Sequence, residues 1–438
     1  MTFKTFKLAL LSATIITSMT HMAEAKTLGE SVSTSLNSHP EVLIAKQNKA
    51  AILQEWEQAK SGYLPTVDLN IGSGHERSNN STTRNRTARD PSDTGGHRSL
   101  WRNEASLTAN QMIFDGFETS ANICQQRARF ESAAKNTQEV QDTIVLRTVQ
   151  AYLDVLRNKE LVQLSQENLT AHTKYLKQIT ARSDSGRGNK ADIRQAEGRL
   201  ALAEANLYSA QGELKNANAS YKEIVGESPK DLVSYKTPTA DIPTTIEESL
   251  KRALEVNPAI HSAKYDIKAA DSALDGTKAS FYPRLDLELD AQRQQNLDGQ
   301  PGGNNSYSAM ARIRYNLYRG GADIARKREQ TARVQEAHDT LERDRREIEE
   351  RMYEAWNDLQ TAKTRLKPLN NHVVSSGQTK TAYKSQFDIG QRSLLDLLDS
   401  EIEYFNSKTA HINGQYAVDF AVYNVLATTG DIQSSFKK

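Results

Sequence analysis

Residues 63–71 read YLPTVDLNI, and residues 281–289 read FYPRLDLEL. In both stretches a proline, Pro65 or Pro283, stands between a helical pattern and a run in which every second residue is apolar. Proline lacks an amide donor and clashes with the preceding turn, so it ends a helix. An apolar residue at every second position is typical of a β-strand. Each stretch therefore predicts a helix that passes directly into a strand.

The two stretches belong to a longer internal repeat. Residues 28–74 and 246–292 align without a gap at an offset of 218, and from residue 113 onward a second gapless match runs at an offset of 204. The offset changes within the segment Ser78–Arg98, which is rich in Ser, Asn and Arg. A repeat of about 200 residues is too long for a solenoid unit. We therefore expect a duplicated half-domain whose two copies differ mainly in one loop.

The first 25 residues have the pattern of a signal peptide. Lys4 and Lys7 form a basic start, Leu8–Met19 is largely apolar, and Ala23-Glu24-Ala25 is a small-residue cleavage pattern. We therefore expect residues 1–25 to be removed and the mature, exported chain to begin at Lys26. No Cys follows the apolar stretch, which disfavours a lipid-anchored N-terminus.

The rest of the chain is predicted to form two structural repeats, residues 26–244 and 245–438. Each repeat is expected to contain short helices, a β-hairpin and a long helical hairpin. The β-hairpins are placed at about residues 65–114 and 283–318, and the long helical hairpins at 117–226 and 320–430. Pro368 lies inside the last of these and is expected to kink or locally break the helix.

Composition restricts the class of protein. Hydrophobic residues make up 37% of the chain, below the ~45–50% of ordinary globular domains, which disfavours one large core. The formal net charge of +1 gives no reason to propose nucleic-acid binding. After the signal peptide there is no apolar run of the ~20 residues that a spanning helix needs, so any membrane crossing would be made by strands. The single Cys124 is expected to be a small buried side chain.

Four strands per chain imply an oligomer if the sheet lies in lipid. Two sheet edges would leave backbone donors and acceptors unpaired there, at a high free-energy cost. The smallest membrane barrels have about eight strands, and three copies of this chain would supply about twelve. Aromatic residues near the strand ends fit an interfacial belt: Tyr63, Trp101, Phe114, Phe281, Tyr282, Tyr307 and Tyr318.

These features together resemble the TolC family of outer-membrane channel proteins, over essentially the whole mature chain. The resemblance is carried by FDIGQRSLLDLLDSE (387–401), while NQMIFDGFETS (110–120) and VLRTVQAYLDVL (145–156) are similar to members that serve type I protein secretion. It implies a mixed fold, an all-α periplasmic tunnel plus a transmembrane β-barrel that is 12-stranded in a homotrimer. It also implies a periplasmic adaptor (membrane fusion) protein and an inner-membrane ABC or proton-driven transporter as partners, besides outer-membrane lipid.

The resemblance also implies a gate at the tips of the helical hairpins. Asp396 and Asp399 match the family's aspartate ring, and Arg392 with Asp192 matches a latch between neighbouring hairpins. Three chains would place six carboxylates around one opening, where crowding is expected to raise some of their pKa values. Without the resemblance, such an Asp pair would read as a solvated helix face. Phe387 stands where the family often has Tyr, so the second latch contact loses a hydroxyl.

The hairpin tips are also where adaptor proteins contact family members. By position the contact residues are Gly186, Arg187, Gly390 and Gln391. The glycines also fit turns that need a positive φ, and both roles can coexist.

No catalytic constellation, metal-ligand spacing or phosphate loop is visible in the sequence, so we expect neither an enzyme nor a cofactor. The leading hypothesis is an exit duct of a tripartite exporter, serving type I protein secretion. Two alternatives stay open: an outlet for small molecules or drugs, and a periplasmic coiled-coil scaffold without a pore.

Overall fold

The computed structural model describes residues 26–87, 96–186, 188–239 and 242–436. The predicted signal peptide and part of the Ser78–Arg98 loop lie outside these ranges. The chain divides into two compact units. Unit 1 combines the residues before Ser35 with Thr148–Lys236, and unit 2 combines Ser35–Arg147 with the residues from Thr237 onward. The boundaries of the two sequence repeats remain a prediction.

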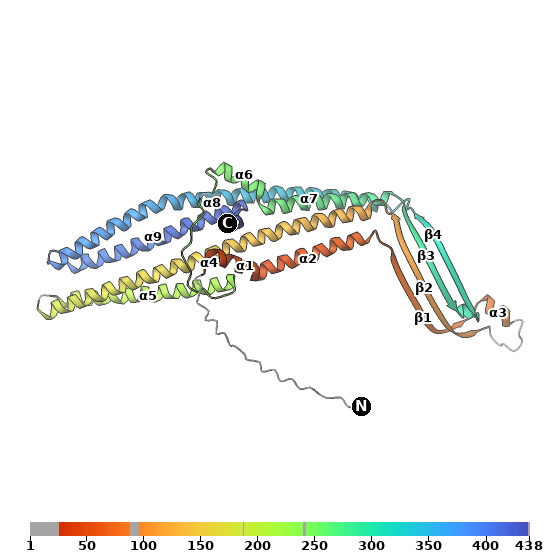
Figure 1. Cartoon of the computed structure of the whole chain (residues 1–438), viewed down its shortest axis with the longest axis horizontal. Helices are drawn as coiled ribbons and strands as arrows, with labels where there is room; N and C mark the ends of the chain where they lie inside the picture. Colours follow the sequence, from red (N-terminus) through yellow and green to blue (C-terminus); the bar gives the residue numbers. More distant parts are fainter. Residues whose placement is uncertain (1–25, 88–95, 187, 240–241, 437–438) are drawn as a thin grey trace, which may run out of the picture. The chain divides into compact units, whose positions relative to one another are not determined.

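The same order of elements occurs twice along the chain (Figure 1). The first set is α1 (Leu28–Ser38), α2 (Pro40–Ser61), β1 (Thr66–Ser78), β2 (Arg98–Phe114), α4 (Glu118–Asp184) and α5 (Lys190–Val225). The second set is α6 (Ile246–Val256), α7 (Pro258–Gly276), β3 (Arg284–Gln295), β4 (Gly303–Arg314), α8 (Ala322–Asp388) and α9 (Leu394–Thr429). Short elements complete the chain: α3 (Ser81–Thr87), η2 (Thr277–Phe281), η3 (Leu297–Gly299) and η4 (Ile432–Phe436).

The predicted passages from helix to strand are confirmed. Helix α2 ends at Ser61, and the N–H of Gly62 donates to the carbonyl of Ala59 before Pro65 stops the helical pattern. Strand β1 then begins at Thr66. In the second copy the 3-10 helix η2 lies between α7 and Pro283, and β3 begins at Arg284.

The four strands form one antiparallel sheet in the order β1-β2-β3-β4 (Figure 1). The register aligns Leu69, Leu107, Ala291 and Tyr307 in one row across the sheet. The adjacent row is Asp68, Thr108, Asp290 and Ser308. Because neighbouring residues of a strand point to opposite faces, one face of the sheet is mainly apolar and the other is polar.

The polar face of the sheet carries ion pairs that cross between strands. Glu288 on β3 accepts from both Arg312 and Arg314 on β4, at 2.7 and 2.6 Å. Arg102 on β2 reaches Glu76 on β1 at 2.9 Å. The apolar face is exposed instead of covered by other elements, with Leu69 at 65% and Ile71 at 75% exposure.

Most of the predicted belt aromatics lie toward the ends of the strands. At the helix-facing end, the rings of Phe114, Phe117 and Tyr282 meet edge to face, with centroids 5.3 to 6.4 Å apart. Trp101, opposite His75, lies toward the other end, whereas Tyr307 lies inside the sheet in the row of Leu69, so its expected place near a strand end is wrong; both side chains are exposed. Their role at a membrane interface stays a prediction.

Helices α8 and α9 form an antiparallel hairpin in unit 2 (Figure 1). The expected break at Pro368 is wrong, because α8 is helical from Ala322 to Asp388. A proline removes one backbone hydrogen bond without necessarily ending a helix that packs against a neighbour, and α9 lies close to α8 at this level. A Cβ atom at Gly414 of α9 would lie 2.7 Å from the Leu369 side chain, so the glycine lets the two helices approach.

A polar layer lies inside this hairpin, nearer its tip. Lys380 of α8 contacts the carboxylate of Glu401 of α9 at 3.1 Å, and Glu401 is only 3% exposed. The Lys380 ammonium also lies over the Tyr404 ring, 4.2 Å from its centroid. Ser376 and Ser407, one from each helix, share a buried hydrogen bond of 2.7 Å.

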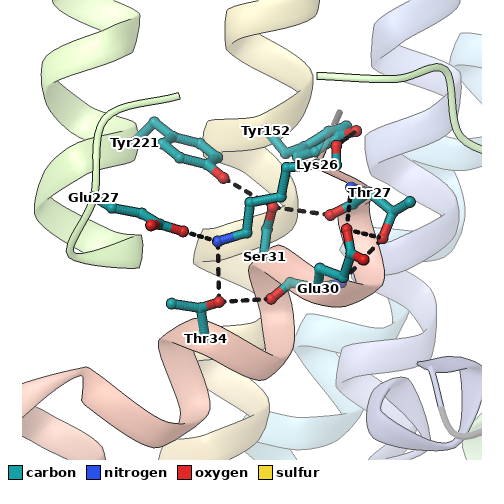
Figure 2. Close-up of polar contacts among 8 residues, drawn as sticks. All are labelled: Lys26, Thr27, Glu30, Ser31, Thr34, Tyr152, Tyr221 and Glu227. Atoms are coloured by element: carbon teal, nitrogen blue, oxygen red, sulfur yellow. Dashed lines mark hydrogen bonds and ion pairs between the residues drawn. The ribbon is translucent and has the colours of Figure 1, made fainter. Parts of the chain in front are cut away.

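The start of the described chain is tied into unit 1 by a polar cluster (Figure 2). The backbone of Lys26 bonds to Asp231 and Val233, and its ammonium contacts Glu227. The Tyr152 hydroxyl donates to the carbonyls of Lys26 (3.0 Å) and Val233 (2.6 Å). Burial raises the pKa of Tyr152 to about 12, so the hydroxyl remains a donor at ordinary pH.

The one cysteine of the chain, Cys124, lies in α4. Cys124 is exposed, so its expected burial is wrong. Cysteine is among the most often buried residue types, but Cys124 lies on an exposed face of its helix.

Within the described residues, no helix combines the length and apolar character needed to cross a membrane.

Candidate functional site

The turn between α8 and α9 is built by glycine capping. Gly390 has φ 79°, and its N–H donates to the Phe387 carbonyl at 3.0 Å. The N–H of Gln391 donates to the Gln386 carbonyl at 2.8 Å. This pair of bonds is a Schellman motif, which needs a left-handed residue where Gly390 stands. The predicted adaptor residues Gly390 and Gln391 thus end α8 and are exposed at the tip, beside Ile389, which is 69% exposed.

Helix α9 begins with a capping box that contains one of the predicted gate aspartates. The amide of Asp396 donates to the Ser393 hydroxyl (3.2 Å), and this hydroxyl donates to the Asp396 carboxylate (2.8 Å). The hydrogen bond from Ser393 and the nearby Arg392 hold the pKa of Asp396 below its usual range. Within one chain, these contacts lower the pKa of Asp396. Crowding of the carboxylates from three chains is expected to act in the opposite direction.

Arg392 is held by its own hairpin. The guanidinium lies over the Tyr383 ring, 4.1 Å from its centroid, and its Nε donates to Gln386 Oε1 at 3.0 Å. Its Nη1 lies 3.7 Å from Asp396 Oδ2, which is an ion pair longer than a hydrogen bond. The Arg392 and Asp396 side chains are 36% and 41% exposed, so each contact is open to solvent on one side.

The other two predicted residues of this tip differ in burial. Phe387 is 6% exposed and belongs to the interior of the hairpin, near the start of the next helix where Leu394 and Leu397 are also buried. Asp399 follows Asp396 by one helical turn and is exposed. Phe387 is therefore a buried side chain of this tip, whereas Asp399 is exposed to solvent, and the latch role of Phe387 stays a prediction.

The α4–α5 turn in unit 1 repeats this construction with different residues. Gly186 has φ 74° and donates to the Ser183 carbonyl at 2.9 Å. Asn189 caps α5 by accepting from the Ala191 amide at 3.0 Å. Asp192 follows in the first turn of α5, and no ion pair engages its carboxylate within the described part of unit 1. The remaining predicted contact, Arg187, lies outside the described residues.

The structure therefore brings together some of the predicted residues and adds others. Arg392 and Asp396 meet, whereas the latch between Arg392 and Asp192 joins residues of different units and stays a prediction. Ser393, Tyr383 and Gln386 were missed in the sequence. The spacing of Ser393 and Asp396 is itself a capping-box signature and would have identified the first of them. Among the described residues, no group of three or more His, Cys, Asp or Glu could hold a metal ion.

Comparison with known proteins identifies the family of this chain. The family model described as outer membrane efflux protein matches residues 31–227 and 249–431. The outer membrane efflux protein BepC of Brucella suis biovar 1 (strain 1330) is 24% identical over 427 residues, which cover 96% of this chain and 88% of BepC. The outer membrane protein TolC of Escherichia coli (strain K12) is 22% identical, covering 94% of this chain and 83% of its own. The proteases secretion protein PrtF of Dickeya chrysanthemi is 21% identical, with 94% and 89% covered.

Solved structures agree at the level of the fold. A crystal structure of CusC superposes with a TM-score of 0.78 at 16% identity and covers 92% of this chain and 91% of its own. The outer-membrane channel OprN gives a TM-score of 0.77 at 19% identity, with 92% and 90% covered. The predicted fold class, helical tunnel plus β-barrel with four strands from each chain, is confirmed by this likeness. The chain therefore belongs to the outer membrane efflux protein family, and it is a protein of the outer membrane.

Proposed function

We propose that this chain forms, as a homotrimer, the passive exit duct of a tripartite exporter. An inner-membrane transporter supplies the energy, a periplasmic adaptor joins the two, and the duct itself catalyses no reaction. The two-faced sheet is the observation that carries this proposal. An exposed apolar face suits lipid, and the opposite polar face suits a water-filled passage.

The edges of the sheet support the trimer. Strands β1 and β4 are the outer strands, and each pairs with one neighbour in the chain. In lipid these edges need partners, because water is absent there to bond the free backbone groups. Pairing β4 of one copy with β1 of the next closes a barrel of about twelve strands from three copies.

We further propose that the hairpin tips form the periplasmic gate and the docking point for the adaptor. Asp396 and Asp399 supply a ring of carboxylates that favours cations and repels anions. Arg392 and Asp192 supply the latch, since an arginine–carboxylate pair is directional. Gly186, Arg187, Gly390 and Gln391, with the exposed Ile389, present the surface to which the adaptor binds.

Type I protein secretion is the favoured use of the duct. The segments 110–120 and 145–156 resemble secretion members, and one relative is named for protease secretion. Efflux of small molecules is the second candidate, because BepC is named as an efflux protein. Deleting the gene and assaying both secreted proteins and drug susceptibility separates the two. Loss of a secreted protein supports the first use, and hypersensitivity alone supports the second.

The latch gives the direct test of the duct. In planar bilayers the purified protein is expected to give small channels, and Arg392→Ala or Asp192→Ala is expected to widen them several-fold, because each removes one side of the latch. Arg194→Ala is the matched control. It also removes a charge near a hairpin tip, but Arg194 is 83% exposed and, among the described residues, its ion pair is with Glu197 one turn along the same helix. Absence of any channel from well-folded protein would favour the scaffold alternative.

A further inference from the structure

The two hairpin tips are copies of each other, yet they differ around one cation. At the offset of 204, Arg392 corresponds to Gly188, and Tyr383 corresponds to Ile179. In the first tip, a Cβ atom at Gly188 would lie 2.8 Å from the backbone of Ser183, so no larger side chain fits there. At these two aligned positions the first copy has neither the cation nor the aromatic ring, so the cluster around Arg392 has no counterpart among the described residues of the first tip.

The contacts of Arg392 come from three different groups of its own hairpin. The Tyr383 ring covers one face of the guanidinium, and Gln386 accepts from Nε. Asp396 provides a carboxylate at 3.7 Å. Planar guanidinium groups stack well on aromatic faces, and such a contact at a half-exposed site is weak enough to be reversible.

The two carboxylates available to Arg392 are equivalent in the repeat. Asp396 and Asp192 correspond at the offset of 204, and both lie in the first turn of the second helix of their hairpin. An arginine that exchanges one such carboxylate for the other keeps the same kind of ion pair. The balance between the two positions is then decided by the remaining contacts, those with Tyr383 and Gln386.

We propose that Tyr383, Gln386 and Asp396 form a resting site for the Arg392 guanidinium, which holds it when the latch to Asp192 is released. This inference rests on the proposed gate. In it, Tyr383 and Gln386 are positioning residues that stabilise the open state of the duct. They act by competing with Asp192 for Arg392 and have no contact with the transported substrate.

Single-channel recording of the full-length protein tests the competition. Tyr383→Leu and Gln386→Leu each remove one contact of the resting site, so the latched state gains population. We expect the open probability to fall about two- to fivefold, the shift that loss of one weak contact produces. Tyr383→Phe keeps the ring face and is expected to behave like the unaltered chain. Tyr353→Leu, at an exposed tyrosine elsewhere on α8, is the control.

The same substitutions in an Asp192→Ala variant distinguish loss of the resting site from a general weakening of the hairpin. With Asp192→Ala there is no latch to compete with, so Tyr383→Leu and Gln386→Leu are expected to leave the open probability unchanged. A fall that persists in this background overturns the proposal. An opening by Tyr383→Leu as large as that caused by Arg392→Ala also overturns it, because the ring would then support the latch. If the unaltered protein forms no channel, the proposed function fails first.

If Tyr383→Leu does not assemble, Gln386→Leu carries the test alone. Its side chain is half-buried and polar, and replacing it leaves the Schellman bonds intact, since both join backbone groups, at the carbonyls of Gln386 and Phe387. An unchanged open probability in Gln386→Leu would then contradict the resting site.

Discussion

Asp396 combines two roles in one side chain. Its amide and carboxylate complete the cap of α9 with Ser393, while its charge faces Arg392 across the turn. The pKa of Asp396 is lowered, first by the hydrogen bond from Ser393. Because the folded state favours the charged form, the contribution to stability is present above the unfolded pKa of 3.8 and is lost as pH falls through the lower folded value. The cap is therefore intact at neutral pH.

Ser393→Ala tests this arrangement. The loss of an N-cap hydroxyl typically costs about 1 kcal/mol, and the Asp396 pKa should rise toward 3.8 because its main cause of lowering is gone. Hydrogen exchange of the first amides of α9, followed with pH, measures both effects. Ser385→Ala is the control, since the Ser385 hydroxyl donates to the carbonyl of Thr381, one turn earlier in α8, and caps no helix end. Equal exchange rates in the two variants would contradict the capping role.

At the scale of the element, the α8–α9 hairpin shows how far sequence patterns reach. The helices, the turn glycine and the acidic face of the tip all follow from local rules about period and capping. The Lys380–Glu401 pair does not, because it joins residues on opposite helices and depends on their register. The expected local break at Pro368 is not observed, and local rules also omit the tertiary contact at this level, where Leu369 lies against Gly414 of α9.

Lys380→Met is expected to destabilise the hairpin by about 2–4 kcal/mol, between the values for exposed and buried pairs. It removes the lysine from a carboxylate that is only 3% exposed. The double variant Lys380→Met with Glu401→Leu should recover most of the loss, because no buried charge remains. Hydrogen exchange within α8 and α9 reports the change. If the double variant is no better than the single one, the ion pair is not the cause.

At the scale of the whole molecule, the sheet was the most predictable feature and the gate the least. Alternating Val67, Leu69 and Ile71 predicted the strand and its apolar face from period alone. The gate required the resemblance to a family, because an aspartate pair on a helix has no distinctive local pattern. The contacts of the proposed resting site were not predictable, because it is the turn at Gly390 that brings Tyr383 and Gln386 against Arg392.

The two faces of the sheet make a testable contrast. Leu289→Arg places a charge on the apolar face of β3 and is expected to reduce outer-membrane assembly, at a cost of about 2–4 kcal/mol if it lies near mid-bilayer. Gln292→Arg places the same charge on the polar face of the same strand and is expected to assemble normally. The yield of protein in outer-membrane fractions compares them. Similar yields for both would show that the face assignment is wrong.

The alternation of side chains along the four strands also limits which changes of strand length the sheet tolerates, because a register shift is seen at one place, between Met112 and Phe114 of β2. Deleting one residue in the middle of β3 would turn every later side chain of that strand to the opposite face of the sheet. Apolar side chains would then point to the polar face, and charged side chains to the apolar face. Two deletions together would restore the sidedness and merely shorten the strand. We infer that a one-residue change inside a strand needs a bulge to restore the sidedness, as at Met112–Phe114, whereas a two-residue change keeps it, so related proteins suited to thinner or thicker membranes would mostly differ by pairs of residues.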